Sequence, residues 1–259
     1  MSPQFHLVTS LTRREIVGRY RSSALGLLWS LLTPLLMLSI YTFVFGSVFN
    51  ARWTAGDGHS TSEFAVILFA GLIVFQIFSE VINRAPTLVL SNVNYVKKVV
   101  FPLQILPLVA MGSALFHAVV SLLVLVPFIL ITRGAIAPTA LLLPLVLAPF
   151  VVLTLGLSWF LASLGVYVRD IGQILGSVIT ALMFLSPIFY PSSALPANLH
   201  RWLALNPVAL PVEQTRDVLI FGHLPDFIAL GIYAAVAGVV CVAGYAWFQK
   251  TRKGFADVI

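Results

Sequence analysis

The chain has 259 residues, of which 59% are hydrophobic and only 9% are charged, and its formal net charge is +6. Uncharged runs occupy residues 22–51, 99–132, 134–168 and 227–249, and about 20 apolar helical residues suffice to cross a bilayer core of roughly 30 Å. The composition therefore indicates a polytopic membrane protein and excludes an additional soluble domain of about 100 residues or more.

The apolar runs predict helices. Backbone polar groups inside hydrocarbon find partners only within a helix or a closed barrel, and a barrel would show alternating segments of about 10 residues. The chain shows continuous apolar runs instead. We therefore expect an all-α membrane protein with one transmembrane domain over residues 1–259. Its six predicted spans are residues 25–49, 64–83, 103–131, 139–166, 171–190 and 227–248.

Residues 1–22 precede the first predicted span and mix apolar with basic positions. This pattern is typical of an interfacial helix that lies on the membrane surface. Its arginines are candidates for contact with an anionic headgroup entering from the cytoplasm, and simple anchoring at the cytoplasmic face is the alternative. These arginines are Arg13, Arg14, Arg19 and Arg21.

Residues 84–102 form the longest connection on the side of the N-terminus. Helix-compatible residues follow Pro86, and the segment contains the pair Lys97 and Lys98. We expect a short helix along the membrane that a soluble partner could contact. A solvated connector with anchoring lysines is the alternative.

The region after the fifth predicted span combines apolar character with five prolines, which break any continuous helix. Irregular backbone at membrane depth is tolerated only where protein covers it or a cavity hydrates it. We therefore expect two short re-entrant helices that dip into the outer leaflet within residues 191–226. The prolines are Pro187, Pro191, Pro196, Pro207 and Pro211.

The distribution of Lys and Arg predicts the orientation, because cytoplasmic loops retain these residues. If the N-terminus is inside, eleven of the 15 basic residues fall on the inner side and four on the outer side. An even number of spans then places both termini in the cytoplasm. Because the basic residues are dispersed along one membrane face, the net charge indicates attachment to anionic lipid and no nucleic-acid partner.

The sequence predicts no catalytic residue, no metal site and no cofactor within this chain. The single cysteine, Cys241, permits neither an intrachain disulfide nor a cysteine-based metal cluster. No Gly-x-x-x-x-Gly-Lys-Ser/Thr phosphate loop occurs, and no nucleophile and base are predicted to converge. Any ATP hydrolysis must therefore come from another subunit.

An ion-coupled secondary transporter, or a channel for a smaller substrate, is the competing class. Such proteins place ionisable residues within their spans, and the predicted spans hold little beyond Glu80 and His117. A histidine within a helix bundle more often forms hydrogen bonds than it carries protons. The relay interpretation nevertheless stays open for this pair.

Several segments together resemble the type-2 permeases of ABC transporters that export polysaccharides, including O-antigen, capsule and teichoic acid exporters. The resemblance implies a homodimer whose interface forms the channel in the bacterial inner membrane. It also implies two separate ATPase subunits, which bind ATP and Mg, and a lipid-linked glycan as substrate, with O-antigen the expected one. The matching segments are residues 12–29, 95–102 and 168–171, and Ser186-Pro-Ile-Phe-Tyr-Pro, Asn206-Pro and Glu213-Gln-Thr-Arg-Asp.

This resemblance assigns expected roles to residues of this chain. Aromatic rings can guide sugars through their apolar C–H faces, so aromatic residues near the outer ends of spans one and five are candidates to line the channel; lipid-facing rings are the alternative. These are Tyr41, Phe45, Phe184, Phe189 and Tyr190. A second set, on the cytoplasmic face, is expected to contact the ATPase. Its members are Arg84, Asn92, Asn94, Tyr95, Lys97, Lys98, Arg169 and Asp170.

Overall fold

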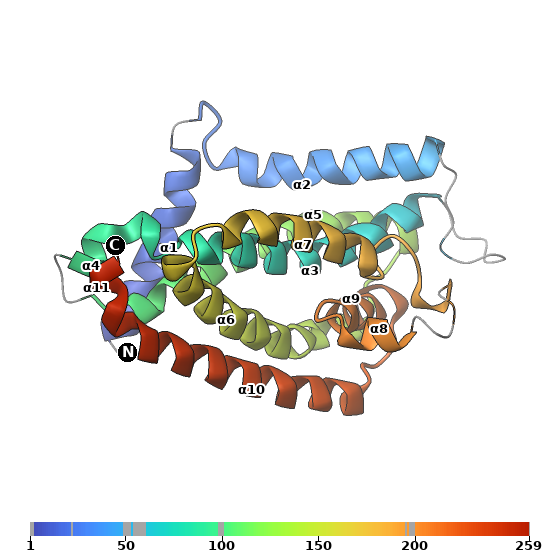
Figure 1. Ribbon diagram of the computed structural model, residues 1–259. Coiled ribbons are helices and arrows are strands. Elements are labelled where there is room, and N and C mark those ends of the chain that lie inside the picture. The colour runs from blue at the N-terminus through green and yellow to red at the C-terminus, as the bar shows by residue number, and fades with distance from the viewer. Residues whose placement is uncertain are drawn as a thin grey trace.

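The computed structural model describes residues 3–21, 23–48, 53, 61–97, 101–194, 196 and 200–258, and this part of the chain contains helices and no strand. The long apolar helices of this part of the chain run side by side along the bundle (Figure 1). They are α2 (Leu28–Tyr41), α3 (Thr61–Arg84), α5 (Leu106–Arg133), α6 (Leu143–Tyr167), α7 (Ile171–Leu185) and α10 (Phe227–Thr251). The others are α1 (Pro3–Tyr20), α4 (Val93–Lys97), α8 (His200–Leu205), α9 (Ala209–Arg216) and α11 (Phe255–Val258).

Both termini lie at one end of the bundle, which we call the proximal end (Figure 1). Helix α1 crosses this end at a steep angle to the bundle axis, and α4 and α11 lie beside it. The opposite, distal end carries α8 and α9. The expected helix within residues 1–22, the short helix within 84–102 and the two short helices within 191–226 are therefore all present as helices.

Among the described residues, five helical segments are long and apolar enough to cross a membrane. They are Leu28–Phe45, Glu63–Thr87, Leu103–Arg133, Pro138–Tyr167 and Phe227–Val258. The predicted fifth span, residues 171–190, is shorter than expected, because α7 ends at Leu185 directly before Ser186 and Pro187. Its 15 residues extend about 22 Å at a rise of roughly 1.5 Å per residue.

Helix α3 forms the centre of the bundle. In the apolar window of its span 78% of the residues are buried, against 6% for Leu28–Phe45. Helix α3 packs along α5 and also contacts α2, α6, α7 and α9. Figure 1 shows α2 at the edge of the bundle, on the side away from α10. The first span is therefore held by few contacts within its own chain.

Helices α6 and α10 approach each other most closely at two glycines. A Cβ atom at Gly156 would overlap the backbone of Cys241, and one at Gly244 would overlap the carbonyl of Gly156. Small residues at a helix crossing allow backbones to approach and gain van der Waals contact inside a membrane. This contact fixes α10 along α6.

Local signals explain where two of the spans begin and end. The Asp226 carboxylate accepts hydrogen bonds from the backbone N–H groups of Ile228 and Ala229, both at 3.0 Å, and so caps the start of α10. Helix α5 ends at Gly134, whose φ of 75° lies in the left-handed region that glycine adopts without steric cost.

The C-terminal segment folds back onto the proximal end. Phe255 is fully buried and packs edge-on against Phe248 of α10, with ring centres 5.5 Å apart. The Tyr167 hydroxyl donates to the Thr251 carbonyl at 2.9 Å. Helix α11 also contacts α4 and α6. The last helix thus lies against the segment that we expected to meet a soluble partner.

Candidate functional site

Aromatic rings from α2, the π-helical turn Thr42–Val48, α3 and the α7–α8 connection meet at the distal end. The ring of Phe45 lies 6.4 Å from Tyr41, 5.4 Å from Phe64 and 6.4 Å from Phe189, centre to centre. Phe189 in turn stacks on Phe184 at 5.6 Å. We call Tyr41, Phe45, Phe64, Phe184 and Phe189 the distal aromatic cluster. Four of the five residues expected to line a channel belong to it.

The fifth, Tyr190, is attached to the same cluster by a hydrogen bond, since its hydroxyl donates to the Phe184 carbonyl at 3.3 Å. The rings of the cluster are partly exposed on the surface of the chain. Phe184 is 60% exposed, and Tyr41, Phe45 and Phe189 are half-buried. The structure therefore brings all five predicted residues together and leaves ring surface available at the distal end.

A buried arginine lies behind this cluster. Arg216, at the end of α9, is 2% exposed and is held by backbone carbonyls. Its guanidinium donates to Ile67 at 3.0 Å, to Ile188 at 2.7 Å and to Pro187. Its charged centre lies 4.5 Å from the centre of the Trp53 ring. A buried charge is stable only where several such partners replace water.

Gly71 of α3 makes room for the Arg216 side chain, because a Cβ atom there would overlap the guanidinium. Arg216 therefore ties α9 to α3 and to the turn immediately before Phe189. The sequence places Arg216 among the outer basic residues and in the Glu213-Gln-Thr-Arg-Asp segment of the resemblance, but predicts no role for it in a site. The signal that could have identified it is an arginine inside an otherwise apolar, proline-rich segment.

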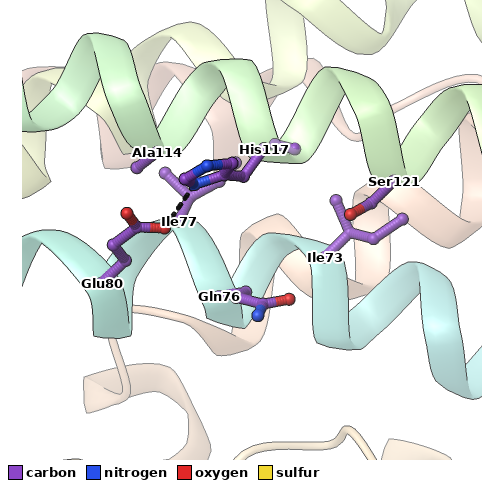
Figure 2. Close-up of a pocket in the computed structure, with 8 residues that line it drawn as sticks. Ile73, Gln76, Ile77, Glu80, Ala114, His117 and Ser121 are labelled. Atoms are coloured by element: carbon purple, nitrogen blue, oxygen red, sulfur yellow. Dashed lines mark hydrogen bonds and ion pairs between the residues drawn. The ribbon is translucent and has the colours of Figure 1, made fainter. Parts of the chain in front are cut away.

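A second cluster, polar in character, lies in the half of the bundle nearer the proximal end. Arg19 Nη1 lies 2.7 Å from Glu80 Oε1, and His117 Nδ1 lies 3.1 Å from Glu80 Oε2. The Tyr20 hydroxyl lies 3.2 Å from His117 Nε2. Figure 2 shows Glu80 of α3 and His117 of α5 pointing toward each other. We call Arg19, Tyr20, Glu80 and His117 the proximal polar cluster.

This cluster connects the end of α1 to the centre of the bundle. The Nδ1 atom of His117 also lies 3.0 Å from Arg19 Nη1, so it either accepts from Arg19 or donates to Glu80, and the two arrangements require different protonation of that atom. The pair of ionisable residues noted in the spans is thus in direct contact, and the predicted headgroup residue Arg19 neutralises it.

The remaining predicted headgroup residues do not join Arg19. Arg13, Arg14 and Arg21 are exposed on or just after α1. Arg13 borders an apolar groove between α1 and α5, whereas Arg14 borders a polar pocket shared with Arg84. The structure therefore separates the four arginines into one that is paired within the bundle and three that face outward.

The predicted ATPase-coupling residues lie at the proximal end. Arg84 is paired with Glu15 of α1 at 2.6 Å, and the Asn92 amide donates to the Leu88 carbonyl at 2.9 Å. The Tyr95 ring stacks on Phe101 with centres 4.2 Å apart. Asn92 and Tyr95 therefore make contacts within the segment, and Arg84 attaches it to α1.

Other residues of that set face outward. Asn94 in α4, and Arg169 and Asp170 in the turn between α6 and α7, are exposed. Lys97 ends α4, and Lys98 lies outside the described residues. We call α4, the turn at Arg169 and Asp170, and α11 the proximal surface.

Comparison with known proteins identifies the family. A family model described as "ABC-2 type transporter" matches residues 6–220. The chain belongs to the ABC-2 type transporter family. The resemblance drawn from the sequence motifs is therefore confirmed.

Three relatives extend over nearly the whole length of this ABC-2 family member. The O-antigen export system permease protein RfbA of Myxococcus xanthus is 30% identical, covering 98% of this chain and 95% of its own. A Klebsiella pneumoniae protein of the same name is 26% identical, with the same coverage. The polysialic acid transport protein KpsM of Escherichia coli is 27% identical over 95% of this chain and 93% of its own.

Proposed function

We propose that this protein is the channel-forming permease subunit of an ATP-driven exporter that moves a lipid-linked polysaccharide, O-antigen first among the candidates, across the bacterial inner membrane. The observation that carries the proposal is the end-to-end match to relatives named as O-antigen and polysialic acid transport proteins. The distal aromatic cluster supports it, since partly exposed rings suit the apolar faces of sugars.

The proposed topology has six spans with both termini in the cytoplasm. The distribution of basic residues supports this orientation, and α7 serves as the short fifth span. In this arrangement the proximal end is cytoplasmic, α1 lies at the membrane interface, and α8 and α9 dip into the outer leaflet. The apolar distal rings then lie at the exit of the substrate path.

The proposed channel forms between two copies of the chain. Helix α7 presents Gly172 and Gly176 on an open face, because nothing lies within 4 Å of a Cβ atom at either position. Gln173 and Thr180, three residues before and four residues after Gly176, are exposed on the same side of this helix. Small residues spaced four apart favour close approach of a second helix within a membrane, so α7 is the proposed contact between copies.

The proposed energy source is a pair of separate ATPase subunits that bind ATP and Mg, since the sequence carries no phosphate-binding loop. The proximal surface is the proposed docking face, because it presents exposed polar residues on α4 and at Arg169 and Asp170. The family match favours this source over ion coupling. The contact between Glu80 and His117 would still permit proton relay, so export should be measured with the proton gradient collapsed and ATP maintained.

The test is complementation of a strain that lacks this permease. Surface polysaccharide should return with the wild-type chain only when the partner ATPase can hydrolyse ATP. The double variant Phe45→Ala, Phe189→Ala should lower export while membrane insertion and ATPase co-purification persist, because it removes ring surface from the distal aromatic cluster. Phe43→Ala is the matched control, since Phe43 is exposed on the same turn and, among the described residues, its ring contacts none of the cluster rings.

Two results would contradict the proposal. One is normal surface polysaccharide in the strain without the permease. The other is export that continues with a hydrolysis-deficient ATPase and stops when the proton gradient is collapsed. Normal export by the Phe45→Ala, Phe189→Ala variant would remove the distal aromatic cluster from the substrate path and leave the exporter assignment intact.

A further inference from the structure

A polar cavity lies between α2 and the pair formed by α3 and α5, well inside the predicted membrane spans. Its volume is about 330 Å³, at the lower end of the roughly 300–1,000 Å³ found for small-molecule sites. The proximal polar cluster closes one end of it. Uncharged polar side chains project into the remainder from α2, α3 and α5, namely Ser30, Thr33, Gln76 and Ser121.

Gln76 is the most informative of these side chains. It lies near the middle of α3, the most buried span, yet it is exposed because it faces the cavity. Within the described residues, the side chains of Gln76, Thr33 and Ser121 form no hydrogen bond with another protein group. Hydrocarbon offers such groups no partner, and an unsatisfied amide or hydroxyl at membrane depth is costly. The cavity is therefore built for a polar occupant.

The charges of the cavity favour an uncharged occupant. The Arg19 guanidinium is neutralised by Glu80 at 2.7 Å, and the Glu80 carboxylate also contacts His117. A phosphate group would have to displace Glu80 from Arg19 or lie beside a carboxylate of like charge, and like charges at short range repel. The groups left free are an amide and hydroxyls, which both donate and accept hydrogen bonds.

The part of α2 that lines the cavity leads toward the distal aromatic cluster. Thr33 and Met37 line the cavity, and Tyr41 and Phe45 belong to the cluster. Residues spaced four apart on a helix lie on the same face. Phe69 of α3 adds an aromatic wall inside the cavity itself. Polar groups and an aromatic wall together suit a sugar ring, which presents hydroxyls at its edge and C–H groups on its face.

We infer that this cavity is a binding subsite for one uncharged sugar unit of the transported chain, with Gln76 as its main hydrogen-bonding residue. The inference rests on the proposed export function and adds to it a sugar-binding subsite that the substrate meets before it reaches the distal aromatic cluster. A sugar that reaches the cavity exchanges hydrogen bonds with Gln76 and Thr33 and then meets the distal rings along α2.

The first experiment measures occupancy. Gln76→Cys and a control, Val119→Cys, are made in a Cys241→Ala background, and cells are treated with a membrane-permeant maleimide. Val119 is exposed on α5 and does not line the cavity. Cells that synthesise the lipid-linked glycan should label Gln76→Cys more slowly than cells in which glycan synthesis is blocked. Val119→Cys should label equally in both.

The second experiment measures transport. Gln76→Leu removes the amide while keeping a residue that a membrane helix accepts, and its export rate should fall about tenfold, as expected for the loss of one to two hydrogen bonds of roughly 0.5–1.5 kcal/mol each. Gln76→Asn retains the amide and should recover part of that rate. Co-purification with the ATPase should be unchanged in both variants, because Gln76 lies remote from the proximal surface.

Equal labelling of Gln76→Cys in the two kinds of cells, together with wild-type export by Gln76→Leu, would overturn the inference and leave only water in the cavity. Protection of Gln76→Cys by undecaprenyl phosphate added to the purified transporter in nanodiscs, without glycan, would also overturn it in favour of an anionic headgroup. Neither result would contradict the proposed function. That function is tested separately by complementation with a hydrolysis-deficient ATPase.

Discussion

Arg216 shows how a single buried charge can organise a membrane protein. A guanidinium in apolar surroundings is costly unless several acceptors replace its water. Here the acceptors are the carbonyls of Ile67, Pro187 and Ile188. Two of them belong to the turn that leads into Phe189. The hydrogen bonds of Arg216 therefore hold this turn, and with it the Phe189 ring of the distal aromatic cluster, in a fixed position.

This arrangement predicts a pair of destabilised variants. Arg216→Leu leaves the carbonyls of Pro187 and Ile188 without a donor, and should lower the free energy of unfolding by about 2–6 kcal/mol, at roughly 1–3 kcal/mol for each of the two unsatisfied groups. Gly71→Ala pushes a methyl group into the guanidinium and should cost roughly 1–3 kcal/mol. Thermal unfolding of the purified protein in detergent measures both.

The matched control is Gly231→Ala in α10, where nothing lies within 4 Å of the added Cβ atom. Alanine is favoured over glycine in a helix by about 1 kcal/mol, so this variant should melt at or slightly above the wild-type temperature. Equal melting temperatures for Gly71→Ala and Gly231→Ala would show that Gly71 is not required for the seating of Arg216.

The residues of the sites differ in how far the sequence could predict them. The candidate channel aromatics could be picked out because they lie near the ends of apolar runs, and the structure brings them together. Their role in the channel stays a prediction. The proximal polar cluster was not, because Arg19 is separated from Glu80 by 61 positions and from His117 by 98. Residue type alone marks each as unusual in its segment. Only the packing of α1 against α3 and α5 shows that they neutralise one another.

At the scale of elements, the helix boundaries differ in how far the sequence could predict them. Helical character was predictable from apolarity, and the end of α7 at Leu185 follows from Pro187, which removes a backbone donor two residues later. The start of α4 at Val93 was not predictable, because residues 87–97 offer several possible N-cap residues, namely Thr87, Ser91, Asn92 and Asn94. That boundary decides how the proximal surface is best perturbed.

Proline substitutions at two positions of α4 test whether this helix itself, within residues 84–102, binds the ATPase. Val96→Pro removes a backbone donor inside α4 and should disrupt the helix at a cost of about 3 kcal/mol or more. Val96 also packs against the cluster around Phe255. We therefore expect Val96→Pro to reduce ATPase co-purification and stimulated hydrolysis, with insertion into the membrane retained.

Val93→Pro is the control within the same helix. Val93 is the first residue of α4, a position at which proline is tolerated because its N–H has no helical acceptor. ATPase binding should stay close to that of the wild type. If Val96→Pro binds and stimulates the ATPase as well as Val93→Pro does, then α4 is a connector and the docking face lies elsewhere.

At the scale of the whole molecule, the bundle is unevenly packed. Helix α3 is enclosed, whereas α2 and α7 leave large apolar side chains exposed. In a membrane such exposure faces either lipid or another protein surface. The extents of five spans were predictable from the sequence, but the uneven packing was not, because periodicity is weak in helices that are apolar on all sides. Two of the exposed helices, α2 and α7, carry the predicted channel aromatics Tyr41 and Phe184.

Cross-linking distinguishes lipid from a second copy on these faces. We expect Gln173→Cys and Thr180→Cys on α7, in a Cys241→Ala background, to form cross-linked dimers with a short thiol-reactive linker in native membranes. Both positions are exposed and flank Gly176 on the side of the helix where Gly172 and Gly176 allow a second α7 to approach closely. Val239→Cys on α10 is the control, since it is also exposed and lies on a helix whose glycine contact with α6 is already made within one chain. Dimers should form at the α7 positions and not at Val239. The opposite pattern would place the contact between copies on α10, and the distal aromatic cluster would then face lipid instead of a path shared by two subunits.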